Sequence, residues 1–186
     1  MAGLHSLTAQ QKAIGLARAR GKLISVDPNF RTPLWADREA MLRAGRHLVA
    51  QAAIVKLSEE ELAALAPGQP IEAAARSLWH DGLELMAVTQ GAAGALMLTR
   101  DHIYRHGGFR VEAVDTTAAG DAFMASLLSG LLDIGLDFAA EDQMASILRS
   151  ACAAGALAAT RKGAMGSLPA PEDIAHLLRI RCENPV

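Results

Sequence analysis

Several residue types that define whole protein classes are scarce in this sequence. It has two cysteines, Cys152 and Cys182, which argues against a disulfide framework and fits a reducing compartment. Its net charge is −2, so charge alone attracts neither nucleic acid nor an anionic membrane. No apolar run approaches the length of a membrane span, and the N-terminus lacks the charged-then-apolar order of a signal peptide. These absences predict a soluble, cytoplasmic protein that binds neither nucleic acid nor membrane.

Patterns typical of metal sites and of common nucleotide sites are also missing. The six histidines are scattered, and none is paired with another histidine or a cysteine at metal-ligand spacing. A P-loop is excluded because Gly15 and Gly21 are one residue too far apart and Leu23 stands where a magnesium-binding serine or threonine is needed. With an ordinary globular composition, the 186 residues predict one domain, 1–186, with a substantial core.

The most informative stretch is Asp115–Phe123, which reads Asp-Thr-Thr-Ala-Ala-Gly-Asp-Ala-Phe. A strand predicted over 109–114 precedes it, and a helix predicted over 122–132 follows. Small residues therefore stand where a loop enters a helix, and there the first backbone N–H groups and the helix dipole form an anion site. Asp121 adds a carboxylate beside that site, a combination suited to phosphoryl transfer onto a hydroxyl. The alternative is that Asp121 only favours the dipole of its own helix.

A second candidate segment is Asp27–Arg31, which reads Asp-Pro-Asn-Phe-Arg. It follows a short buried strand predicted over 23–26, and the carboxyl ends of strands are where ligands bind in α/β sheets. An ordinary Asp-Pro-Asn turn is the alternative explanation.

Two other motifs have a structural explanation of their own. Ser58 and Glu61 form a capping box at the start of a helix, after a strand predicted over 53–57. Gly91 and Gly94 connect two predicted strands, 85–89 and 95–98, as a glycine-spaced hairpin would. Glycines also permit a ligand to approach the backbone closely. The remaining predicted elements are helices over 8–20, 37–51, 71–80, 138–160 and 171–179.

Together these motifs resemble the ribokinase-like (PfkB-type) sugar kinases. The family signature, Asp-Thr-x-Gly/Ala-Ala-Gly-Asp, matches 115–121, with Ala118 in place of the commoner glycine. The Asp-Pro-Asn-x-Arg segment, followed by Pro-Leu-Trp over 33–35, is similar to the fructokinase branch. Ser58 departs from the family's Asn-x-x-Glu, as fructokinase-like members often do. The resemblance runs from about residue 10 to about residue 180, through motifs in the family's order.

The resemblance implies catalytic roles for the signature residues. Asp121 would be the catalytic base that accepts the proton of the sugar hydroxyl. The anion hole would be lined by the amides of three residues: Ala118, Ala119 and Gly120.

The resemblance also implies roles in binding. Asn29 and Arg31 would lie near the phosphates and the sugar, and Glu61 would organise Mg²⁺ through water. The approach of ATP would use three residues that match a Val-Thr-x-Gly-x-x-Gly segment: Thr89, Gly91 and Gly94. A monovalent cation, K⁺, would bind at six matching positions: Asp115, Thr117, Ala158, Arg161, Gly163 and Ser167.

The fold implied by the resemblance is α/β, a three-layer α/β/α sandwich with a largely parallel sheet whose N-terminal strands and lid are missing. The implied reaction is transfer of the γ-phosphoryl group of ATP to a sugar hydroxyl, with fructose as the nearest substrate. Ribose, 2-keto-3-deoxygluconate and ribosides stay open as substrates. A fragment of a longer kinase, a natural short member and a non-catalytic nucleotide-binding remnant also stay open. Because missing strands would leave an apolar sheet edge, we expect a homo-oligomer or a partner chain.

Overall fold

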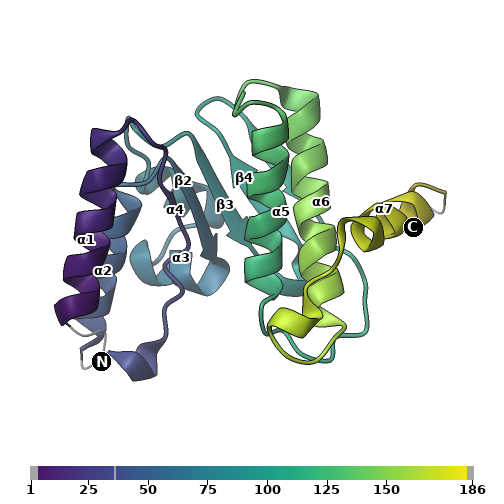
Figure 1. Ribbon diagram of the computed structural model, residues 1–186, viewed down its shortest axis with the longest axis horizontal. Coiled ribbons are helices and arrows are strands. Elements are labelled where there is room, and N and C mark those ends of the chain that lie inside the picture. Colours follow the sequence, from purple (N-terminus) through teal and green to yellow (C-terminus); the bar gives the residue numbers. More distant parts are fainter. Residues whose placement is uncertain (1–3, 36, 184–186) are drawn as a thin grey trace. The chain divides into compact units, whose positions relative to one another are not determined.

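The computed structural model describes residues 4–35 and 37–183, which form the helices and strands drawn in Figure 1. The chain divides into two compact units, residues 1–88 and residues 89–186, within the span predicted as one domain. None of the described helices is long and apolar enough to cross a membrane.

The first unit is built from parallel strands joined by helices. Its elements are α1 (Leu4–Ala19), β1 (Ser25–Val26), η1 (Thr32–Leu34), α2 (Arg38–Val49), β2 (Ile54–Ser58), α3 (Glu59–Leu65), α4 (Ile71–Ser77) and β3 (Leu85–Thr89). β1 and β2 pair in parallel, with Ser25 opposite Ile54, and α2 forms the crossover between them. β2 and β3 are almost wholly buried, as their largely apolar sequences favour, although β2 also contains Lys56. This arrangement confirms the predicted α/β class.

The second unit combines a hairpin with a pair of long helices. Its elements are η2 (Gly91–Ala93), β4 (Ala95–Leu98), β5 (Ile103–His106), α5 (Ala119–Asp133), α6 (Glu141–Ala159), η3 (Met165–Ser167) and α7 (Pro171–Glu183). β4 and β5 pair antiparallel, with Ala95 opposite His106. α5 and α6 lie side by side (Figure 1), and Gly130 of α5 lets Ile147 of α6 approach its backbone.

One predicted strand is wrong, and a second is only partly right. Residues 109–114 form no strand; the strand is β5, at 103–106, because those residues pair with β4. Val114 is 63% exposed, and its N–H donates to the Ala159 carbonyl at the end of α6. The strand predicted as buried over 23–26 is shorter and is not buried, since Leu23 is 49% exposed.

Candidate active site

The loop before α5 is shaped by an unusual backbone conformation at Ala118. This residue is the N-cap of α5 and has φ 61° and ψ 4°, a left-handed conformation that side chains other than glycine rarely adopt. An alanine side chain cannot accept a hydrogen bond, so the start of α5 has no side-chain cap. Strain of this kind is concentrated at functional sites, and here it turns the chain directly into the first turn of the helix.

The first amides of α5 are those predicted to line an anion site. Ala119 N–H donates to the Thr116 carbonyl at 3.2 Å, while the amides of Ala118 and Gly120 have no acceptor among the residues that the structure describes. Asp121 lies in the first helical turn and is exposed. A carboxylate thus lies beside backbone N–H groups at the positive end of a helix dipole. This arrangement can bind a phosphate and accept a proton next to it.

Gly155 is a residue of the site that sequence reasoning missed. A Cβ atom at this position of α6 would lie 3.2 Å from the carbonyl oxygen of Ala119 and 3.6 Å from Cβ of Phe123. The absence of a side chain therefore lets α6 support the first turn of α5. A glycine inside a predicted helix, where it costs about 1 kcal/mol relative to alanine, was the available signal.

Asp115 ties the signature loop to the loop that follows α6. Its Oδ1 accepts from Thr117 N–H at 2.9 Å and its Oδ2 accepts from Gly163 N–H at 3.0 Å. Hydrogen bonds from the side chain of Thr117, then from the amides of Gly163 and Thr117, lower the pKa of Asp115 from 3.8 to about 2. Because the folded pKa is depressed, this tether is fully present above about pH 4 and is lost as the pH falls through about 2.

The other residues predicted around a monovalent cation are held by separate contacts. Ser167 is buried, and its hydroxyl donates to the Ala164 carbonyl at 2.8 Å. Ala158 is also buried, and its carbonyl accepts from the Arg161 amide at 3.3 Å. The Arg161 guanidinium points to Asp173 at 3.0 Å. These contacts order the loop, and the cation site itself stays a prediction.

The two glycines of the hairpin turn differ in what surrounds them. Gly91 has φ 56°, and a Cβ atom there would meet nothing within 4 Å. Gly94 has φ 92°, and its Cβ would collide with the backbone of His106 and Gly108. Gly94 is therefore required by packing, while a side chain at Gly91, two residues after the half-buried Thr89, would meet only open space.

In the first unit, the segment 27–31 presents Asn29 and Arg31 outward. Both are exposed, and Asn29 has φ 53°. Asp27 forms an ion pair with Lys56 of β2, with Nζ 2.9 Å from Oδ2. Sequence reasoning missed Lys56, although a lysine between apolar strand residues was the signal, and it is only 6% exposed.

Glu61 is occupied by backbone donors on both carboxylate oxygens. Its Oε2 accepts from Ser58 N–H at 2.8 Å, and Ser58 Oγ accepts from Glu61 N–H, which confirms the predicted capping box. Its Oε1 accepts from Phe30 N–H at 2.7 Å, which joins α3 to the segment 27–31. The role of Glu61 near Mg²⁺ stays a prediction.

No group of three or more His, Cys, Asp or Glu residues that could hold a metal ion occurs in the described part of the chain. Mg²⁺ is commonly bound by one or two carboxylates together with the phosphates of a nucleotide.

Comparisons with known proteins lead to one family. Residues 1–171 match the family model described as "pfkB family carbohydrate kinase". The chain is 38% identical over 172 residues to Fructokinase-2 of Solanum habrochaites. This alignment covers 92% of this chain and 52% of that protein. The chain thus spans about half the length of this relative.

Solved structures are similar to the fold as well. A fructokinase double mutant from Vibrio cholerae O395, in its fructose-, ADP- and potassium-bound form, has a TM-score of 0.86 at 34% identity, covering 95% of this chain and 57% of that one. A putative ribokinase II from E. coli, in complex with ATP and Mg²⁺, has a TM-score of 0.82 at 29% identity, covering 96% and 55%. These likenesses confirm the predicted ribokinase-like α/β fold.

Proposed function

The chain belongs to the pfkB family of carbohydrate kinases, and we propose that it carries the catalytic base and nucleotide-binding portion of an ATP-dependent, fructokinase-like sugar kinase. The observation that supports this most directly is the left-handed turn at Ala118, which places Asp121 beside the first amides of α5. The cysteine pattern of the sequence favours a reducing compartment, which is consistent with a kinase located in the cytoplasm.

In the proposed reaction, a sugar hydroxyl oxygen attacks the γ-phosphorus of ATP. The bond from that phosphorus to the bridging oxygen of ADP breaks, and the hydroxyl proton passes to Asp121. The first amides of α5 hold the charge on the migrating phosphoryl group, and Arg31 adds positive charge. Asp121, the amides and Arg31 would thus contribute by positioning the reactants and stabilising charge, which are the main protein contributions to phosphoryl transfer.

The cofactors are proposed on the same basis. Mg²⁺ enters with ATP, neutralises phosphate charge, and is reached by Glu61 through water, since both Glu61 oxygens already accept backbone N–H groups. K⁺ fits the loop around Asp115, where a carboxylate and nearby carbonyl groups supply the oxygen donors that hard cations prefer.

Substrate choice gives a first prediction. A six-carbon ketose should be preferred, because the segment Asp27–Trp35 resembles fructokinases. Initial rates of phosphate transfer from radiolabelled ATP should be measured for fructose, ribose, 2-keto-3-deoxygluconate and aminoimidazole riboside. The highest kcat/KM is expected for fructose, and a riboside in first place would contradict the fructokinase placement. Nucleotide binding without transfer to any sugar would instead favour a non-catalytic remnant.

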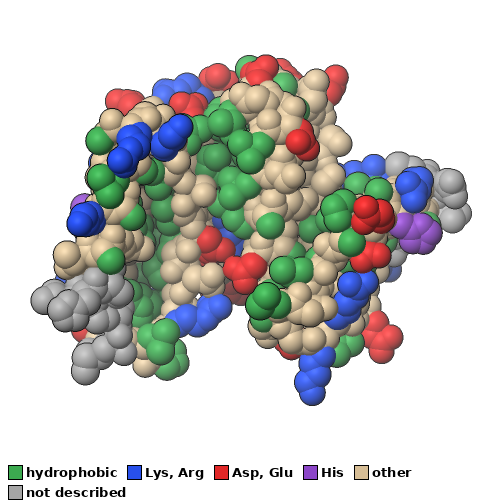
Figure 2. All heavy atoms as spheres, viewed as in Figure 1, with side chains coloured by type: hydrophobic (Ala, Val, Ile, Leu, Met, Phe, Trp, Pro, Cys, Tyr) green, Lys and Arg blue, Asp and Glu red, His purple; other side chains and the backbone are tan. Residues whose placement is uncertain are grey.

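The oligomeric state of the protein gives a second prediction. β1 pairs with β2 and with no other described strand, so its second edge offers unpaired backbone groups. Leu23, which precedes β1, and Leu16 of α1 are 49% and 46% exposed, and Figure 2 shows hydrophobic side chains interspersed with Lys and Arg over α1. We expect self-association through this edge, with a mass at least twice that of the monomer in size exclusion with light scattering.

The matched variants test which surface associates. Leu23→Lys places a charge at the β1 edge and should shift the chain toward the monomer. Leu132→Lys, at a 66% exposed position of α5, should leave the mass unchanged. A monodisperse monomer of the unaltered chain would refute the association.

A further inference from the structure

The segment 27–31 is fixed at its start by a buried ion pair. Asp27 Oδ2 lies 2.9 Å from Lys56 Nζ, and the two side chains are 14% and 7% exposed. Lys56 stands in the middle of β2, the neighbour of β1, so its ammonium reaches the carboxyl end of β1. Burial of a lysine costs solvation that is recovered only with a paired partner.

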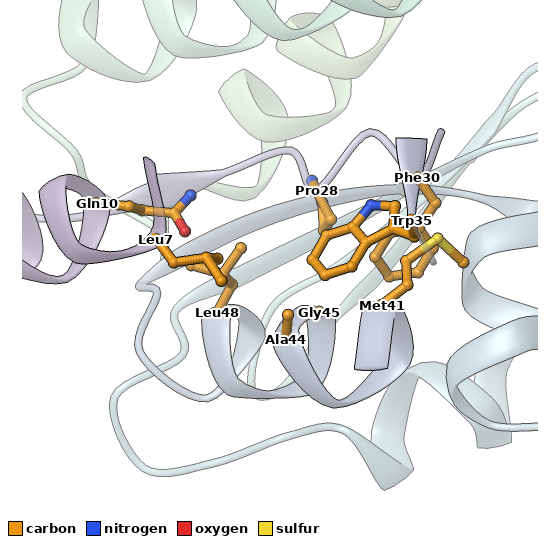
Figure 3. Close-up of a pocket in the computed structure, with 9 residues that line it drawn as sticks. All are labelled: Leu7, Gln10, Pro28, Phe30, Trp35, Met41, Ala44, Gly45 and Leu48. Carbon is orange, nitrogen blue, oxygen red and sulfur yellow. The ribbon is translucent and has the colours of Figure 1, made fainter. Parts of the chain in front are cut away.

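The same segment is fixed a second time at Phe30. The Phe30 N–H donates to Glu61 Oε1 at 2.7 Å, at the first turn of α3. The Phe30 ring lies against Gly45 of α2, where a Cβ atom would collide with it. Pro28 and Phe30 both line a hollow of about 170 Å³, together with Trp35 (Figure 3).

Between the two anchors, the chain turns outward. Asn29 has φ 53°, which asparagine tolerates better than most residues, and both Asn29 and Arg31 are exposed. Residues 27, 28 and 30 are thus held by an ion pair, apolar packing and a hydrogen bond. The side chains of Asn29 and Arg31 remain accessible to a ligand, and the family resemblance places both near the phosphates of ATP.

We propose that Lys56 is a positioning residue for nucleotide binding: it acts through Asp27 to hold the segment 27–31 so that Asn29 and Arg31 meet the phosphates. The proposal rests on the proposed function. A buried ion pair is a poor source of stability compared with apolar residues of similar volume, so a role in geometry accounts for its presence at this loop.

The test replaces both Asp27 and Lys56, so that neither charge is left buried without its partner. The double variant Lys56→Met/Asp27→Leu should keep the denaturation midpoint of the unaltered chain, since apolar replacement of a buried pair is often neutral. Its affinity for Mg·ATP, measured by calorimetry, should nevertheless fall about tenfold or more, the loss expected when a hydrogen bond to a charged group is misplaced. Hydrogen exchange of the Phe30 amide should become faster by a similar factor.

A thermodynamic cycle with Arg31→Ala separates positioning from direct contact. If Lys56 acts through the loop, adding Arg31→Ala to the double variant should cost little further affinity, because the Arg31 contact is already impaired. Additive losses would overturn the proposal. Arg43→Met is the control: it breaks an exposed ion pair with Asp37 in the same unit and should change neither the affinity nor the Phe30 exchange.

The remaining outcomes are also decisive. A stable double variant with unaltered affinity and unaltered Phe30 exchange would overturn the positioning role. If the unaltered chain binds no Mg·ATP, the proposed function fails. The positioning of the loop by Lys56 is then decided by Phe30 exchange alone: faster exchange at an unchanged denaturation midpoint supports it, and unchanged exchange overturns it.

Discussion

Replacement of Asp121 by asparagine is expected to lower phosphoryl transfer about 10²–10⁴-fold, the usual contribution of a general base. The amide keeps the shape of the side chain at the first turn of α5 but cannot take the proton of the attacking hydroxyl. The amides of Ala118, Ala119 and Gly120, which are predicted to hold the phosphoryl group, are left in place. Affinity for ATP should therefore change little while turnover is lost.

The measurement needs both quantities from the same preparation. Turnover is followed with radiolabelled ATP and fructose, which detects slow reactions, and ATP affinity is measured by calorimetry. Asp133→Asn, at the last residue of the same helix, is the matched control and should retain both. An Asp121→Asn variant with about a third or more of the unaltered turnover would rule out Asp121 as the base.

The parts of the site that were predictable from the sequence are governed by local chemistry. The capping box of Ser58 and Glu61 and the boundaries of β3 and β4 were predicted correctly because each depends on residues a few positions apart. The start of α5 was placed within three residues, since small residues and an acidic first turn mark a helix N-terminus.

The parts that were not predictable depend on residues far apart in the chain. The ion pair of Asp27 and Lys56 joins positions 29 residues apart, and the bond from Gly163 to Asp115 spans 48 residues. The strand predicted over 109–114 failed for the same reason: its valines favour a strand locally, but β4 pairs with 103–106 instead. Tertiary pairing decided between two segments of similar propensity.

Replacement of Gly94 by alanine is expected to destabilise the protein by about 3 kcal/mol or more. Gly94 has φ 92° and ψ −131°, a conformation available almost only to glycine, and such strain costs about 1–3 kcal/mol by itself. The added Cβ would also collide with the His106 carbonyl and the Gly108 amide, which are backbone groups that cannot rotate away. Because β4 and β5 would have to separate at this end, we expect the larger value.

Gly91→Ala in the same turn is the matched control. Its φ of 56° is also left-handed, at a cost of about 1–2 kcal/mol, but its Cβ would meet nothing within 4 Å. Urea denaturation of both variants should therefore show a clearly larger loss for Gly94→Ala. Since the open space at Gly91 is where ATP is predicted to approach, Gly91→Ala should be the variant that weakens ATP binding while the protein stays folded. Equal losses of stability in the two variants would show that the contact of Gly94 with the 106–108 backbone does not control the hairpin.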